Sequence, residues 1–249
     1  GSLFFTLFKG EADAALMNEI CFDAFVLGNH EFNEGDKGVA KFIDFLKSEK
    51  CTTSVLAANI KPEVGVSPLT PNSETDYIQP YTIVEKGGIK VGIIGIDIVR
   101  KTIMSSSPDQ TTKFLDEAET SQKIVNELKQ SGIKHIILLT HYGYENEIEL
   151  AAKIDGVDVI IGGDSHTLLG DFGKLGLNAA GPYPTVVKGV SGKSVCVATA
   201  WQYSQIVGEM TISFNEDGEV QSCKGIPHLM LADSFKRKNS EGDRIEIKG

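Results

Sequence analysis

Apolar residues recur along this chain with two spacings, one typical of amphipathic helices and the other of buried strands. Helical spacing predicts helices at residues 3–19, 38–47, 117–131 and 146–153. Short continuous apolar runs predict strands at residues 24–27, 54–59, 136–140 and 157–161. Because these strands and helices alternate along the chain, the pattern predicts a parallel sheet with crossover helices.

A second group of strands with short turns fills the last third of the chain. They are predicted at residues 185–188, 194–200, 206–214 and 220–223. An earlier pair, 81–85 and 89–96, flanks Lys86-Gly87-Gly88 and reads as a hairpin. The fold class predicted is α/β, with two packed mixed β-sheets flanked by helices. Residues 232–249 are charged and show no apolar period, which predicts a tail or linker.

Three of the predicted strands end at polar residues that can bind a ligand. Asn29-His30 follows the strand at 24–27, His141 follows 136–140, and Asp164 and His166 follow 157–161. Parallel strands bring their carboxyl ends to one edge of a sheet, where open α/β sheets bind ligands. Taken alone, Gly28-Asn29 is equally typical of a turn. The convergence of the three strand ends predicts a site.

The same three segments carry a family resemblance. Gly28-Asn29-His30-Glu31-Phe32, the His141 segment and Gly162-Gly163-Asp164-Ser165-His166 resemble, in order, motifs of the calcineurin-like metallophosphoesterases of the 5'-nucleotidase branch. The resemblance covers nearly the whole chain, up to about Pro227. It implies a four-layer sandwich and the hydrolysis of nucleotide phosphate esters by a metal-activated water.

The resemblance also implies a set of metal ligands. Asn29, His141, Asp164 and His166 match ligand positions for two divalent ions, and Zn, Mn, Fe or Co suits such mixed donors. Asp164 stands where the family motif more often has His. A carboxylate is still a competent ligand, although it changes the charge of the site. The alternative for Asp164 is an Asx-turn that caps its loop.

His30 and Asn33 match the catalytic positions of the family. The resemblance implies that His30 protonates the leaving oxygen or stabilises the phosphoryl group. In 5'-nucleotidases an Asp occupies the position of Asn33, whereas Asn there is similar to 2',3'-cyclic-nucleotide phosphodiesterases. Pyrophosphate links such as those of NAD or UDP-sugars are further candidate substrates, and a sulfur-compound hydrolase is disfavoured because His30 is retained.

The family begins with Asp-x-His and Gly-Asp motifs that this chain does not contain. We therefore expect residues 1–231 to be an N-terminally incomplete catalytic domain. Residues 232–249 would lead to an absent C-terminal domain that binds the nucleotide. A hypothesis of a different class is that this chain is a catalytically inactive fragment or a binding domain.

Composition narrows the partners and the compartment. A formal net charge of −10 argues against binding a nucleic acid duplex, and no apolar run is long enough to span a membrane. The resemblance implies a periplasmic, secreted or cell-surface protein. Cys21 and Cys51 precede neighbouring predicted strands, and Cys196 and Cys223 lie on two later ones. Two disulfides and four buried thiols are both compatible with this pattern, with the resemblance slightly favouring disulfides.

Overall fold

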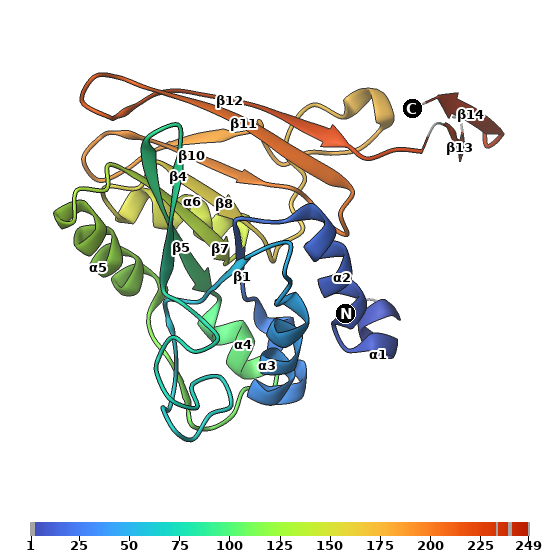
Figure 1. Cartoon of the computed structure of the whole chain (residues 1–249). Coiled ribbons are helices and arrows are strands. Elements are labelled where there is room, and N and C mark those ends of the chain that lie inside the picture. The colour runs from blue at the N-terminus through green and yellow to red at the C-terminus, as the bar shows by residue number, and fades with distance from the viewer. Residues whose placement is uncertain (1–2, 233, 239–240, 249) are drawn as a thin grey trace.

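The structure is a computed structural model that describes residues 3–232, 234–238 and 241–248 (Figure 1). The helices are α1 (Leu3–Phe8), α2 (Glu11–Ile20), η1 (Asn29–Glu34), α3 (Gly35–Leu46), α4 (Val99–Ser105), α5 (Glu117–Gln130), α6 (Tyr144–Lys153) and η2 (Gly173–Leu175). The strands are β1 (Ala24–Val26), β2 (Ser54–Leu56), β3 (Ile60–Pro62), β4 (Tyr81–Lys86), β5 (Ile89–Asp97), β6 (Thr112–Phe114), β7 (His135–His141), β8 (Val159–Gly162), β9 (Thr185–Lys188), β10 (Ser194–Thr199), β11 (Ile206–Phe214), β12 (Val220–Leu229), β13 (Ser234–Lys238) and β14 (Arg244–Lys248).

A six-stranded mixed sheet forms the centre of the molecule, in the order β4-β5-β7-β8-β10-β9. The strands β5, β7, β8 and β10 are parallel, and β4 and β9 are antiparallel edge strands. Alternate residues of β7 face opposite sides, so Ile136 and Leu138 are fully buried against the helical layer that includes α5 and α6. The α/β class and the several sheets flanked by helices confirm the predicted fold class.

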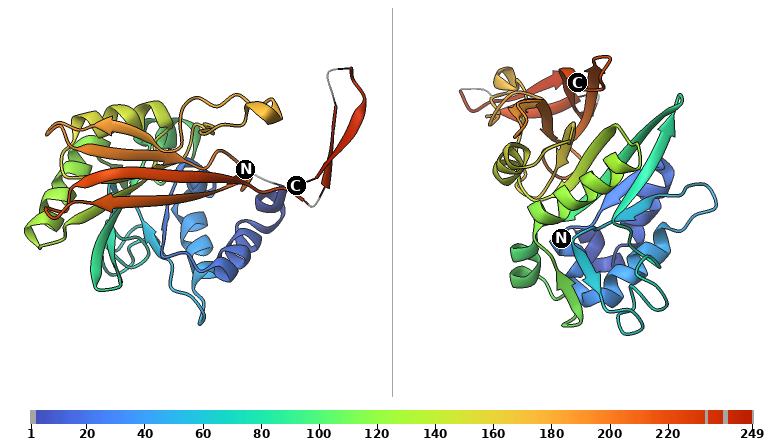
Figure 2. Two further views of the ribbon diagram at one scale, coloured as in Figure 1. Left: turned by 90° about the horizontal axis from the view of Figure 1, so that it is seen from above. Right: turned by 90° about the vertical axis from the view of Figure 1, so that its left-hand side faces the viewer.

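The long β11–β12 hairpin packs on the opposite face of this sheet (Figures 1 and 2). Its Met210, Ile212 and Phe214 side chains contact Val159 and Cys196 of the central sheet. A disulfide between Cys196 and Cys223 links β10 to β12. The second layer of strands predicted from the sequence is therefore a two-stranded sheet covalently tied to the first.

The N-terminal third builds a second core beside the central sheet. The short parallel pair β1–β2 packs with α3 through the buried side chains of Leu27, Val39 and Ile43. A backbone hydrogen bond of 2.7 Å from Ala58 N to Gly95 O joins this unit to β5. A disulfide between Cys21 and Cys51 closes the unit at its other end. This packing carries the end of β1 to the ends of the central strands.

Two sequence-based expectations about local structure are wrong. The predicted helix over 3–19 is broken, because Lys9 and Gly10 have φ values of 54° and 90° and end α1 before α2 begins. The predicted tail at 232–249 contains the β13–β14 hairpin, which projects from the body of the molecule (Figure 2). Charged residues on an exposed hairpin mask the alternation that a buried strand would show. The domain boundary at residue 231 remains a prediction.

Candidate active site

Side chains from three strand ends meet at one edge of the structure. Asn29 begins η1 directly after β1, His141 ends β7, and Asp164 follows β8. The Nε2 atom of His141 lies 2.9 Å from Oδ1 of Asn29 and 3.3 Å from Oδ1 of Asp164. The structure thus brings together three of the four ligand positions expected from the sequence.

Glycine allows the close approach of these segments. A Cβ atom at Gly28 would lie 2.7 Å from the His141 ring, closer than real side chains pack. The adjoining Asn29 is almost fully buried, and its Nδ2 donates to Ser105 Oγ at the end of α4. The amide oxygen of Asn29 is thereby turned toward His141.

Asp164 carries the negative charge of this cluster. Its side chain is only 11% exposed and forms an ion pair with Lys101 of α4 in addition to its contact with His141. Desolvation raises the pKa of this carboxyl group, but the contacts with His141 and Lys101 outweigh that effect and hold the pKa below its ordinary value. Asp164 is therefore an ionised carboxylate at neutral pH.

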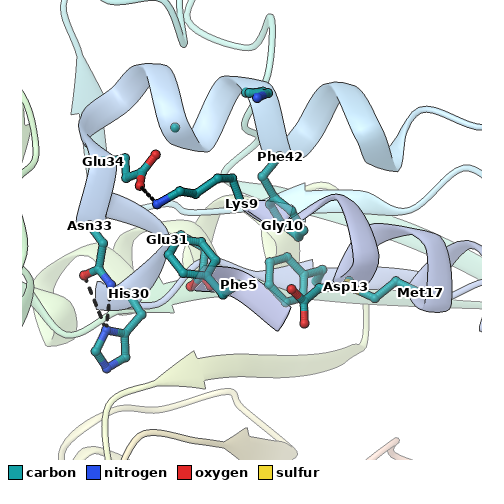
Figure 3. A pocket seen from close by; sticks show the side chains of 13 residues that line it. Phe5, Lys9, Gly10, Asp13, Met17, His30, Glu31, Asn33, Glu34 and Phe42 are labelled. Carbon is teal, nitrogen blue, oxygen red and sulfur yellow. Dashed lines mark hydrogen bonds and ion pairs between the residues drawn. The ribbon is translucent and has the colours of Figure 1, made fainter. Parts of the chain in front are cut away.

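His30 and Asn33 form a separate pair on η1. The Nδ1 atom of His30 lies within 3.2–3.3 Å of both ends of the Asn33 amide group. Asn33 Oδ1 also accepts a hydrogen bond from Ser106 Oγ, and Ser107 N donates to Phe32 O. Figure 3 shows the His30 ring turned outward, away from the side chains that fill the space behind η1. The exposed imidazole is available to a substrate at this edge.

The space behind η1 is a cavity of about 330 Å³ between the N-terminal helices and α3 (Figure 3). Aromatic rings of Phe5, Phe25 and Phe42 line it, and a Lys9–Glu34 ion pair lies beside them. Because the His30 ring is directed away from these rings, the cavity does not bring a second reactive group to the site.

His166 lies in different surroundings from the other expected ligands. Its ring packs edge-on against Tyr203 with centroids 5.3 Å apart, and in the part of the chain that the structure describes no hydrogen bond or ion pair joins it to Asp164. Positive φ angles occur at Asp164 and His166 after β8, and at Trp201, Tyr203 and Ser204 after β10. Strained residues of this kind gather at functional sites, and these two loops lie at the same sheet edge.

The pattern of residues matches a known family. The family model for calcineurin-like phosphoesterases matches residues 7–168. The chain belongs to the calcineurin-like phosphoesterase family. The matched range includes the segments of Asn29, His141 and Asp164, and the family resemblance inferred from the sequence is confirmed.

Relatives of known structure share both the sequence and the fold of this phosphoesterase chain. The NAD nucleotidase of Haemophilus influenzae is 42% identical with a TM-score of 0.89, and the match covers 100% of this chain and 43% of that one. A 5'-nucleotidase precursor from Thermus thermophilus is 39% identical with a TM-score of 0.83, over 92% and 43% of the two chains. A probable 5'-nucleotidase of Treponema pallidum is 39% identical over 97% of this chain. The chain spans about two fifths of the length of such relatives.

The donor set of the phosphoesterase site suits a divalent cation. An amide oxygen, an imidazole nitrogen and a carboxylate oxygen lie within 2.9–3.3 Å of one another along the chain Asn29, His141, Asp164. Among the described residues, no group of three His, Cys, Asp or Glu side chains is placed to hold a metal ion, so the third donor here is the Asn29 amide. Mixed nitrogen and oxygen donors of this kind fit Zn, Mn, Fe or Co.

Sequence reasoning missed three acidic residues that support the site. Glu31 accepts from Gly28 N at 2.7 Å, and burial raises the pKa of its carboxyl group. Asp97, which lies opposite His141 in the β5–β7 register, is fully buried, and burial raises its pKa well above the ordinary value. The fully buried Glu147 accepts from Thr140 Oγ1 and the Gly143 N–H. Only Glu31 had a sequence signal, since it belongs to the Asn29-His30 motif.

Glu147 gives the fold a pH dependence that can be measured. Burial raises the pKa of its carboxyl group from 4.5 to about 7, so the folded protein holds a proton that the unfolded chain releases between these values. Stability is therefore lost as the pH rises through this window. We expect Glu147→Gln, which cannot titrate, to be about 2.5 kcal/mol more stable relative to wild type at pH 8 than at pH 5.

Urea unfolding with EDTA at both pH values measures this difference. Glu149→Gln is the matched control, because Glu149 lies on the same helix α6 with an exposed side chain paired to Lys153. Parallel pH profiles for wild type and Glu147→Gln would show that the carboxyl group of Glu147 titrates normally.

Proposed function

We propose that this domain is the catalytic part of an enzyme that hydrolyses nucleotide phosphate esters. The observation that carries the proposal is the meeting of Asn29, His141 and Asp164 at 2.9 and 3.3 Å beside the His30–Asn33 pair. The relatives described above are named as 5'-nucleotidases and an NAD nucleotidase, and these names support this class of substrate.

Asn29, His141, Asp164 and His166 are the residues that we assign to binding two divalent ions. When bound, such ions neutralise the charge of a phosphoryl group and lower the pKa of a water molecule. For His166 to join the other three, its ring must leave the edge-on contact with Tyr203. Support for the set comes from the shared sheet edge of the β8 and β10 loops.

His30 is the residue that we assign to proton transfer. Its ring is exposed and its Nδ1 atom is held by Asn33, so the Nε2 atom is the one presented to a substrate. A proton delivered from Nε2 to the leaving ester oxygen completes the cleavage of the phosphorus–oxygen bond. Asn33 fixes the ring without adding a negative charge, in contrast to an Asp at that position.

The substrate is proposed to be a 5'-nucleotide, with NAD as the second candidate. NAD is favoured by the 42% identity to the Haemophilus influenzae protein named NAD 5'-nucleotidase. The chain spans 40% of that relative, so the remaining length of a similar full protein has room for a C-terminal domain that grips the base and ribose. We assign nucleotide specificity to such a domain.

An extracytoplasmic location is part of the proposal. All four cysteines of the sequence are paired, as Cys21–Cys51 and Cys196–Cys223. Disulfides of this kind persist in oxidising compartments such as the periplasm or the cell exterior. No helix in the described part of the chain is long and apolar enough to cross a membrane.

The test is phosphate release by the natural full-length protein from AMP, NAD and a 2',3'-cyclic nucleotide, with added Mn²⁺ or Zn²⁺ and elemental analysis of bound metal. We expect activity on AMP or NAD that EDTA abolishes. Release from the cyclic nucleotide alone would transfer the proposal to the cyclic phosphodiesterases. Absence of both metal and activity would reject the enzyme in favour of a binding domain.

A further inference from the structure

Lys101 brings a positive charge to the candidate metal site from a separate element. Its ammonium group contacts Oδ1 of Asp164, the same oxygen that lies 3.3 Å from His141 Nε2. The Lys101 side chain is 43% exposed, whereas that of Asp164 is 11% exposed. The ammonium group is therefore hydrated on one side and faces the cluster on the other.

The position of Lys101 is fixed by the packing of α4. In the middle of this helix Thr102 Oγ1 donates to the buried Asp97 carboxyl group at 2.5 Å. At its last residue Ser105 Oγ accepts from Asn29 Nδ2. Since α4 is anchored at two points to residues around the site, its Lys101 side chain is held within reach of Asp164.

The charge balance explains why a lysine at this place matters. A carboxylate at Asp164 adds one negative charge compared with the histidine that is more usual in the related motif. The ammonium group of Lys101 removes that extra charge from the site. An anionic phosphate substrate is repelled by an uncompensated carboxylate, and a metal cation is repelled by the ammonium group.

We propose that Lys101 sets the charge of this site, weakening its hold on a divalent cation while strengthening its hold on the phosphate of the substrate. This inference rests on the proposed function. It makes Lys101 a residue that acts on two ligands with opposite signs. A lysine that only supports the fold would affect both ligands in the same direction.

The test compares Lys101→Met with Lys101→Arg, which keeps the charge, in the natural full-length protein. Titration calorimetry measures Mn²⁺ binding first, and then the binding of inorganic phosphate at saturating Mn²⁺. We expect Lys101→Met to bind Mn²⁺ about tenfold more tightly and phosphate about tenfold more weakly than wild type. Lys101→Arg should stay within about twofold of wild type for both ligands.

A metal-dependent melting shift gives a second readout that does not require activity. Without metal, Lys101→Met leaves the largely buried carboxylate of Asp164 without its ammonium partner, so its Tm should fall. Added Mn²⁺ takes the place of the lost cation. The rise in Tm on adding Mn²⁺ should therefore be larger in Lys101→Met than in wild type.

The outcomes separate this inference from the proposed function. Mn²⁺ binding by wild type with unchanged or weaker binding by Lys101→Met overturns the role of Lys101 and leaves the metal site standing. Weaker binding of both ligands by both variants shows a structural role. No Mn²⁺ binding by wild type rejects the proposed site, and the inference with it.

Discussion

His141→Ala is expected to lower the affinity of the site for Mn²⁺ or Zn²⁺ by roughly 100-fold, with a matching loss of phosphate release at limiting metal. The Nε2 atom of His141 lies close to both Asn29 and Asp164. Its removal separates the remaining amide and carboxylate oxygens and leaves no nitrogen donor between them. Titration calorimetry and elemental analysis of the purified variant measure the loss.

His228→Ala is the matched control for His141→Ala. His228 lies on β12, with a side chain that is 47% exposed and 2.8 Å from Glu209 Oε2. Its removal should leave metal binding and the Tm within experimental error of wild type. Equal metal affinity in wild type and His141→Ala would place the metal elsewhere and reject the site.

Reduction of both disulfides should destabilise the domain by about 7 kcal/mol, near the whole free energy of unfolding of an ordinary domain. Cys21–Cys51 and Cys196–Cys223 span 30 and 27 residues. Loop closure over such lengths is worth about 3.5 kcal/mol each, and the two effects add because the loops are separate in the sequence. Urea unfolding with and without a phosphine reductant measures the change.

The two pairs can be separated by double Cys→Ser variants. Loss of Cys196–Cys223 frees β12 from the central sheet, whereas loss of Cys21–Cys51 loosens the unit that carries Asn29 and His30. We therefore expect the second variant to lose more metal affinity than the first. A variant that lacks all four cysteines should show no response to reductant, and a response would expose an effect unrelated to the disulfides.

The strand ends and their chemistry could be predicted from the sequence because the signals are local. The apolar run before His141, the hairpin around Gly87-Gly88 and the helix that became α5 each depend on the spacing of neighbouring residues. The expected strand at 206–214 has the bounds of β11. Parallel strands then place their carboxyl ends together by geometry alone.

Distances between remote residues were decided only by the tertiary structure. Asn29 and His141 are 112 residues apart in the sequence, and Lys101 and Asp164 are 63 apart. No local pattern marks Lys101, because its role depends on how α4 packs against Asp97 and Asn29. The ring of His166, expected among the ligands, instead packs on Tyr203.

The sequence by itself determined the family, the order of the elements and the residue types at the sheet edge. The tertiary structure decided which of these residues touch and what charge they carry. Glu147 shows the reason, since the pKa of about 7 arises from burial that spacing along the chain does not encode. Electrostatic free energies depend on distance and solvent exposure in space, so charge at this site is a property of the fold.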